Sequence, residues 1–203
     1  MIALATEQEE KSRIREEISR KRNAMTDAEA ESKSTAIIKN LAKLAEYKKA
    51  RAVMFYAAKG NEVQTRKLVE AALKEGKTVL LPITNTSKKE IEPAVIENYD
   101  SDLKKGAFGI MEPDPFSEKV QSKNESDDAK IDVVIVPGVA FDLEGHMLGY
   151  GHGFYDKLLR RLNAARIGLA YDFQIVKKLP RESHDEKMDI IVTESRTINA
   201  SGG

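Results

Sequence analysis

The stretch VPGVAFDLEGHMLGYGHGFYDKLLRR, residues 136–161, decides the fold of this chain. It begins at the end of an apolar run, residues 131–136, whose composition predicts a strand buried in a parallel sheet. It leads into residues 154–162, where apolar side chains recur at helical spacing: Phe154, Leu158, Leu159 and Leu162. The stretch therefore predicts a strand, a glycine-rich turn and a helix in that order.

The turn between them contains four glycines, Gly145, Gly149, Gly151 and Gly153. Glycine lets the backbone approach a ligand closely, and the free N–H groups at a helix start attract anions. The pattern is not a Walker A loop, because no Lys-Ser/Thr pair follows the glycines. It is not a GxGxxG fingerprint either, because position 154 is phenylalanine. We expect an anion site of another kind, and a purely structural tight turn is the alternative.

Predicted strands alternate with predicted helices along the 203 residues, which indicates one α/β domain with a mostly parallel central sheet and helices on both faces. We expect strands at residues 52–57, 77–82, 131–136, 166–171 and 188–193, with an edge strand at 91–96. We expect helices at residues 7–23, 26–44, 63–74 and 154–162. Pro82 should end the second strand, and Thr26 with Glu29 should form a capping box.

The single domain should extend over residues 1–203, with residues 1–6 and 199–203 frayed and residues 114–130 forming a polar surface loop. The formal net charge of +0 gives no electrostatic reason to expect nucleic acid or a membrane as a partner. The chain has no cysteine, so a thiolate metal site and a cysteine nucleophile are excluded. It shows neither a signal peptide nor an apolar run of membrane-spanning length, and we expect a cytoplasmic protein.

The stretch PGVAFDLEGHMLGYGHGFYD, residues 137–156, resembles the signature of the 5-formyltetrahydrofolate cyclo-ligases, also called methenyltetrahydrofolate synthetases. Weaker matches extend from residue 11 to residue 189. The resemblance implies a three-layer α/β/α, Rossmann-like fold. It also implies an enzyme that uses ATP and Mg²⁺ to cyclise 5-formyltetrahydrofolate to 5,10-methenyltetrahydrofolate, with release of ADP and phosphate.

On this resemblance, Lys11 and Arg15 hold the phosphates of ATP as cationic stabilisers, a role that suits a mobile ammonium and a planar guanidinium. From spacing alone, a solvated helix face is the alternative for both. The resemblance also implies that the glycine loop walls the nucleotide site through Gly149, Tyr150, Gly151, His152, Gly153, Phe154 and Tyr155. No covalent nucleophile is expected.

The folate site implied by the resemblance contains Glu62, with Tyr56, Phe108 and Tyr155 beside it. A carboxylate accepts paired hydrogen bonds from the amino group and ring N–H of a pterin. The alternatives are an acid that favours a helix start for Glu62 and an ordinary buried side chain for Phe108. The resemblance makes Asp156 and Asp189 ligands of Mg²⁺, whereas Asp156 alone also fits an acid in the first turn of a helix.

Met147 departs from the family pattern, which usually has a basic residue two positions before the first glycine of the alternating set. Loss of a cation there should weaken stabilisation of the transferring phosphoryl group. Two rival functions therefore stay open: a non-catalytic nucleotide- or folate-binding relative, and an ATP-dependent enzyme acting on another formylated pterin. In each case we expect small-molecule partners and a monomer or weak homo-oligomer.

Overall fold

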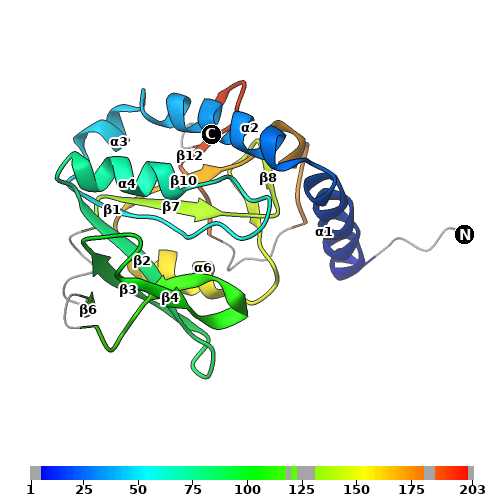
Figure 1. Cartoon of the computed structure of the whole chain (residues 1–203). Helices are drawn as coiled ribbons and strands as arrows, with labels where there is room; N and C mark the ends of the chain where they lie inside the picture. The colour runs from blue at the N-terminus through cyan, green and yellow to red at the C-terminus, as the bar shows by residue number, and fades with distance from the viewer. Residues whose placement is uncertain (1–5, 118–119, 123–130, 181–185, 201–203) are drawn as a thin grey trace, which may run out of the picture.

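The computed structural model describes residues 6–117, 120–122, 131–180 and 186–200. Its main sheet is built from β1 (Ala52–Met54), β2 (Thr78–Asn85), β3 (Glu90–Ile96), β6 (Gln121–Ser122), β7 (Val133–Pro137), β10 (Ala165–Leu169), β12 (Ile190–Val192) and β13 (Thr197–Asn199). Their order across the sheet is β13-β12-β10-β7-β1-β2-β3-β6 (Figure 1). The central strands from β12 to β2 are parallel, and the outer strands pair antiparallel. The predicted mostly parallel sheet is confirmed.

Helices cover both faces of this sheet, as Figure 1 shows for α2 (Asp27–Leu41), α3 (Ala45–Lys49) and α4 (Arg66–Lys74) on one side and α6 (Phe154–Arg161) on the other. Successive side chains of a strand point to opposite faces, so β7 contributes to both cores. Val133 and Ile135 belong to the cluster with α2 and α4. Val134 and Val136 belong to the cluster with α6. The three-layer α/β architecture is therefore as predicted.

The first helix, α1 (Glu7–Asn23), lies beside the layers, at one end of the sheet (Figure 1). Its Ile18 packs against Ala140 and Leu148. These two residues belong to a small sheet of β8 (Ala140–Asp142), β9 (Met147–Leu148) and β11 (Ile175–Val176). The remaining elements are the pair β4 (Leu103–Lys105) and β5 (Met111–Pro113), and the short 3₁₀ helices η1 (Ala107–Gly109) and η2 (Asp172–Gln174).

The expected direct passage from strand to glycine turn to helix was wrong in one respect. The β8–β9 hairpin stands between β7 and the glycine loop, and it pairs Ala140 with Leu148. Gly145 belongs to the turn of this hairpin and has a φ of +90°. Only Gly149, Gly151 and Gly153 are left to form the loop that leads into α6.

Several predicted boundaries also differ. Strand β2 continues through Pro82, which lies opposite Pro93 of β3. Neither residue has an N–H, so this pair occupies a position where antiparallel partners exchange no hydrogen bonds. Strand β3 is not an edge, because β6 pairs with it inside the expected loop of residues 114–130. The parts of that loop at 118–119 and 123–130 lie outside the described residues.

The predicted start of α4 at residue 63 was also wrong, because the residues before Arg66 bond elsewhere. The carbonyl of Val63 accepts from the Tyr56 hydroxyl, and the amide of Gln64 donates to the Ser34 hydroxyl. The capping box of Thr26 and Glu29 is confirmed, but α2 ends at Leu41 and a separate α3 follows.

The two chain ends are more ordered than expected where the structure describes them. Thr6 caps α1 through a capping box with Glu9. Asn199 pairs with Ile190 in the sheet, and the Ala200 amide donates to the Asp189 carbonyl at 2.8 Å. Residues 1–5 and 201–203 lie outside the described ranges. No helix in the described ranges combines the length and apolar content that a membrane crossing requires.

Candidate functional site

A cavity of about 680 Å³ opens beyond the carboxyl ends of β1 and β7. The chain continues from β1 to β2 on one side, whereas β7 leads to β10 on the other. Such a point, where the strand order reverses, is where open α/β sheets bind ligands. The cavity is lined by α1, by the segments after β1 and β7, and by the glycine loop with the start of α6.

Nearly all the predicted site residues come together around this cavity. Its lining includes Lys11, Arg15, Tyr56, Glu62, Phe108, Gly149, Tyr150, Gly151, His152, Gly153, Phe154, Tyr155 and Asp156. Asp189 is not part of the lining. The fold thus joins three segments that are far apart in the sequence: the first helix, the exit of β1 and the glycine loop.

The cavity face of α1 carries basic side chains at helical spacing. Lys11 and Arg15 are four residues apart, and Arg22 follows two turns later on the same face. Arg15 Nε donates to the Gly149 carbonyl at 2.9 Å. Its guanidinium also lies 3.6 Å from the place where a side chain at Gly151 would begin. Helix α1 therefore holds the glycine loop through Arg15 and places positive charge beside it.

The glycine loop itself is open. An added Cβ at Gly149 or Gly153 would meet no atom within 4 Å. Gly151 and Gly153 have φ values of +91° and +68°, which side chains disfavour. Gly153 is the N-cap of α6 and provides no side-chain cap. The first N–H groups of α6 are therefore placed to meet an anion from the cavity.

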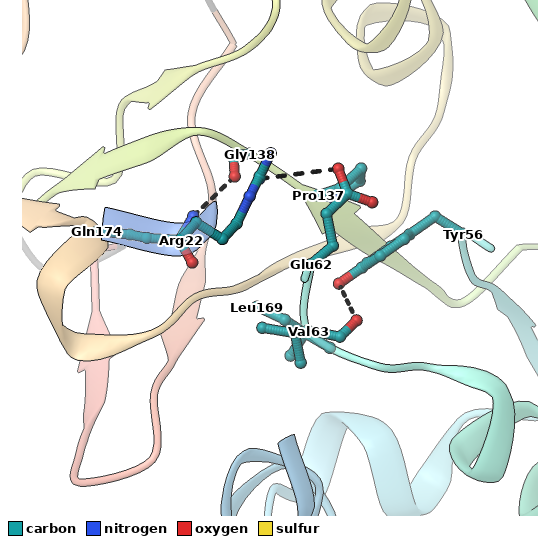
Figure 2. A pocket seen from close by; sticks show the side chains of 8 residues that line it. All are labelled: Arg22, Tyr56, Glu62, Val63, Pro137, Gly138, Leu169 and Gln174. Carbon is teal, nitrogen blue, oxygen red and sulfur yellow. Dashed lines mark hydrogen bonds and ion pairs between the residues drawn. The ribbon is translucent and has the colours of Figure 1, made fainter. Parts of the chain in front are cut away.

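Glu62 forms the polar corner at the other side of the cavity, and it also lines the small pocket drawn in Figure 2. Its Oε2 accepts from the Lys59 amide at 2.9 Å, which fixes the carboxylate against its own turn. Its Oε1 accepts from the Tyr150 hydroxyl at 2.6 Å. Figure 2 also shows the ion pair with Arg22, whose Nη1 lies 3.9 Å from Oε1. Tyr150 thus links the glycine loop to Glu62.

Three tyrosines lie near this carboxylate, and the pKa of each phenol is raised above its usual value. Burial is the main cause of the raised pKa at Tyr56, Tyr150 and Tyr155, and the negative charge of Glu62 adds to it. Tyr56 donates its hydroxyl hydrogen to the Val63 carbonyl at 3.0 Å. The corner is therefore one carboxylate among neutral phenols, which suits a ligand edge that carries hydrogen-bond donors.

Aromatic rings form the rim between the two regions. The His152 ring stacks on Phe154 with centroids 5.7 Å apart, and Phe108 lies 5.3 Å from His152. Phe108 is 50% exposed and has a φ of +55°, so the ordinary buried phenylalanine is excluded. Lys59 Nζ donates to the backbone carbonyl of Phe108 at 2.8 Å and so holds Phe108 at the rim.

The two predicted metal ligands lie in different surroundings. Asp156 lies in the first turn of α6 and lines the cavity. Asp189 precedes β12, where its carboxylate accepts from the Arg166 amide at 2.8 Å. It sits at the amino end of a parallel strand, whereas the cavity is at the carboxyl ends. Within the described ranges, no three acidic or histidine side chains converge as a metal site.

Sequence reasoning missed two buried groups of the cavity. Arg22 is 8% exposed, and its distance of seven residues from Arg15 was a signal that the same helix face continues. Glu112 in β5 is 6% exposed, and its Oε1 has no hydrogen-bond partner in the described part of the chain. Nothing in the sequence placed Glu112 at the cavity. Met147, the residue that departs from the family pattern, also lines the cavity.

Comparison with known proteins points to one family. Residues 7–194 match the model of the "5-formyltetrahydrofolate cyclo-ligase family". The 5-formyltetrahydrofolate cyclo-ligase of Haemophilus influenzae is 30% identical, covering 91% of this chain and 98% of that protein. The enzyme of the same name from Escherichia coli K12 is 31% identical over 72% of this chain and 80% of its own length. The solved structure of Aquifex aeolicus 5,10-methenyltetrahydrofolate synthetase superposes with a TM-score of 0.81 at 37% identity, covering 95% of this chain and 94% of that one.

Proposed function

Since the chain belongs to the 5-formyltetrahydrofolate cyclo-ligase family, we propose that it cyclises 5-formyltetrahydrofolate to 5,10-methenyltetrahydrofolate at the expense of ATP. The products besides the methenyl compound are ADP and phosphate. The proposal includes Mg²⁺ as the metal that accompanies ATP.

One observation supports this proposal above the others. A single cavity joins a cationic helix face and an open glycine loop to a carboxylate corner. The first two features suit the phosphates of a nucleotide, and the third suits the donor edge of a pterin. A reaction that transfers a phosphoryl group onto a bound folate needs both regions within one enclosed volume.

In the proposed reaction, the formyl oxygen attacks the γ-phosphorus of ATP and the bond to ADP breaks. The N10 nitrogen then attacks the formyl carbon and loses its proton, and the carbon–oxygen bond breaks to release phosphate. Lys11, Arg15 and the N–H groups at the start of α6 would stabilise the charge on the transferring group. Glu62 would orient the ring, so that catalysis consists of positioning and charge neutralisation.

The donor chemistry of the cavity fits a magnesium ion held mainly by phosphate. Mg²⁺ prefers oxygen ligands and usually takes one or two carboxylates besides phosphate and water. Asp156 provides such a carboxylate in the cavity lining. Asp189, the second predicted ligand, accepts from the Arg166 amide outside the lining, so the proposal relies on Asp156 for the carboxylate. When bound, the metal would neutralise charge on the phosphates.

The test is to mix the protein with 5-formyltetrahydrofolate, ATP and Mg²⁺ and to follow the ultraviolet absorption of the methenyl product. We expect an ATP-dependent rise in absorption that Asp156→Ala reduces by about a hundredfold or more, as loss of a group that stabilises developing charge does. Asp100→Ala, which changes an exposed carboxylate that is not part of the cavity lining, is the matched control and should keep the wild-type rate.

Absence of any rise from protein shown separately to bind ATP would contradict the proposal. Attention would then turn to Met147, where the family usually has a cation. Competition by other formylated pterins would show whether a different carrier is the substrate.

A further inference from the structure

A buried arginine and Glu62 share one hydroxyl group. The Tyr150 hydroxyl donates to Glu62 Oε1 at 2.6 Å and accepts from Arg22 Nη2 at 2.7 Å. The guanidinium carbon of Arg22 also lies 5.6 Å from the centre of the Tyr150 ring. A single oxygen atom therefore acts as acceptor toward the cation and as donor toward the carboxylate.

Arg22 is short of hydrogen-bond partners for a buried cation. Only 8% of the residue is exposed, and neither Nε nor Nη1 has a hydrogen-bond partner among the described residues. The Nη1–Oε1 distance to Glu62 is 3.9 Å, which is too long for a hydrogen bond. Buried donors are normally paired, and unpaired ones favour an occupant that accepts from them. Two nitrogens of the Arg22 guanidinium beside Glu62 therefore have no acceptor among the described residues.

The positions of the two side chains are coupled by the backbone. Asn61, which precedes Glu62, donates from Nδ2 to the Arg22 carbonyl at 3.2 Å and to the Met25 carbonyl at 2.8 Å. The Lys59 amide fixes the other oxygen of Glu62 at 2.9 Å. The end of α1 and the turn after β1 thus form one rigid support, and the guanidinium and the carboxylate are pre-organised side by side. Figure 2 shows them directed toward one another.

The pterin ring carries a matching pattern along one edge. Its 4-oxo group is an acceptor, and the adjacent N3–H and 2-amino groups are donors. The 4-oxo and N3–H pair presents the same two functions that the Tyr150 hydroxyl presents in the free protein. The Glu62 carboxylate can accept from the N3–H and 2-amino groups, and the Arg22 guanidinium can donate to the 4-oxo group.

We propose that Arg22 is a specificity-determining residue that donates to the 4-oxo group of the folate, while Glu62 accepts from the neighbouring N–H groups. The Tyr150 hydroxyl occupies this position in the free enzyme and leaves it when the ring binds. This inference rests on the proposed function and adds the recognised ring edge to it. A 4-amino ring would place a donor against the donors of Arg22 and, because its N3 carries no hydrogen, an acceptor against Glu62, and would be rejected.

The test compares dissociation constants, without ATP, for 5-formyltetrahydrofolate and its 4-amino-4-deoxy analogue. We expect the wild-type protein to prefer the 4-oxo ligand by about 30-fold, the scale set by leaving buried polar groups unpaired. Arg22→Leu should reduce this ratio by about threefold or more, the remainder reflecting the mismatch of N3 with Glu62, and Arg22→Lys should give an intermediate value. Arg20→Leu, an exposed arginine in the same last turn of α1, is the control and should keep the wild-type ratio.

A second variant tests the placeholder and does not depend on the folding of Arg22→Leu. Tyr150→Phe removes the hydroxyl that the ligand must displace, so we expect 5-formyltetrahydrofolate to bind about tenfold more tightly with the 4-oxo preference intact. Weaker binding by this variant would overturn the placeholder role. Equal wild-type affinity for the two ligands, or an unchanged ratio in Arg22→Leu, would overturn the role of Arg22.

These outcomes are separable from those of the turnover assay. A protein that cyclises the substrate but does not discriminate between the two rings would keep the proposed function and lose this inference. A protein that binds neither ligand would lose both.

Discussion

The two halves of the 137–156 stretch look alike in sequence but differ in the structure. In the β8–β9 hairpin, Gly145 is packed so tightly that an added Cβ would lie 2.5 Å from the Met188 carbonyl oxygen. In the loop that follows, an added Cβ at Gly149 would meet nothing within 4 Å. The β8–β9 hairpin is tightly packed, whereas the glycine loop that follows is open toward the cavity. A glycine pattern thus combines two different physical requirements.

The side chains around the two glycine groups show the same division. Asp142, the last residue of β8, is fully buried, and its carboxylate accepts from the amides of Glu144, His146 and Leu179. In the open loop, the Gly149 carbonyl accepts instead from Arg15 of α1, whose side chain lines the cavity. We therefore expect mutations in the hairpin to affect stability and mutations in the loop to affect binding.

The largest effect is expected from Gly145→Ala. The added methyl group would meet the Met188 carbonyl and the Ala200 side chain, at a residue whose φ of +90° already disfavours a side chain. We expect the free energy of unfolding to fall by about 3 kcal/mol, from overpacking and backbone strain together. Urea denaturation followed by circular dichroism measures it.

Gly149→Ala is the matched control for that experiment. Its φ is not in the positive range and the space around it is open, so stability should change by less than about 1 kcal/mol. Equal losses in the two variants would show that the two halves of the stretch do not differ as argued.

A smaller loss of stability is expected from Asp142→Asn. The carboxylate accepts hydrogen bonds through both oxygens, including the contact of Oδ2 with His146 Nδ1 at 3.1 Å. An amide would turn one of these oxygens into a donor that faces other donors. We expect the free energy of unfolding to fall by about 2 kcal/mol. Asp100→Asn, on an exposed carboxylate paired with Arg66, should cost less than about 0.5 kcal/mol, and an equal cost would contradict the structural role of Asp142.

The sequence predicted the layers well because periodicity reports burial. Continuous or alternating apolar residues predicted the central strands. Residues Val133 to Val136 do pack alternately against the two helical layers. It did not predict the β8–β9 hairpin, whose short strands lie inside a motif that was interpreted as one glycine turn. It also missed β6, whose pairing depends on β3 at a distance in sequence, and β13, a strand of three residues that pairs with β12 across a short turn.

The candidate site was predictable mainly through the family resemblance. Spacing alone left Lys11 and Arg15 as a solvated helix face, and only the fold brings them to the glycine loop. Arg22 was missed although it continues their helical spacing, because a charged residue near a helix end is usually exposed. The resemblance alone also did not show where the Asp189 carboxylate lies, because a motif position does not specify at which end of a strand a side chain is placed.

The smallest effect on stability, and a selective effect on binding, is expected from Arg15→Leu. The guanidinium makes one hydrogen bond to the glycine loop, at a partly exposed position, so the free energy of unfolding should change by less than about 1 kcal/mol. Loss of a cation beside phosphate should weaken ATP binding by about tenfold or more and leave 5-formyltetrahydrofolate binding unchanged. Calorimetric titration with each ligand separates the two, and Arg13→Leu on the exposed face of α1 is the control. If Arg15→Leu lost as much stability as Asp142→Asn and kept its ATP affinity, Arg15 would have a structural role and not a binding role.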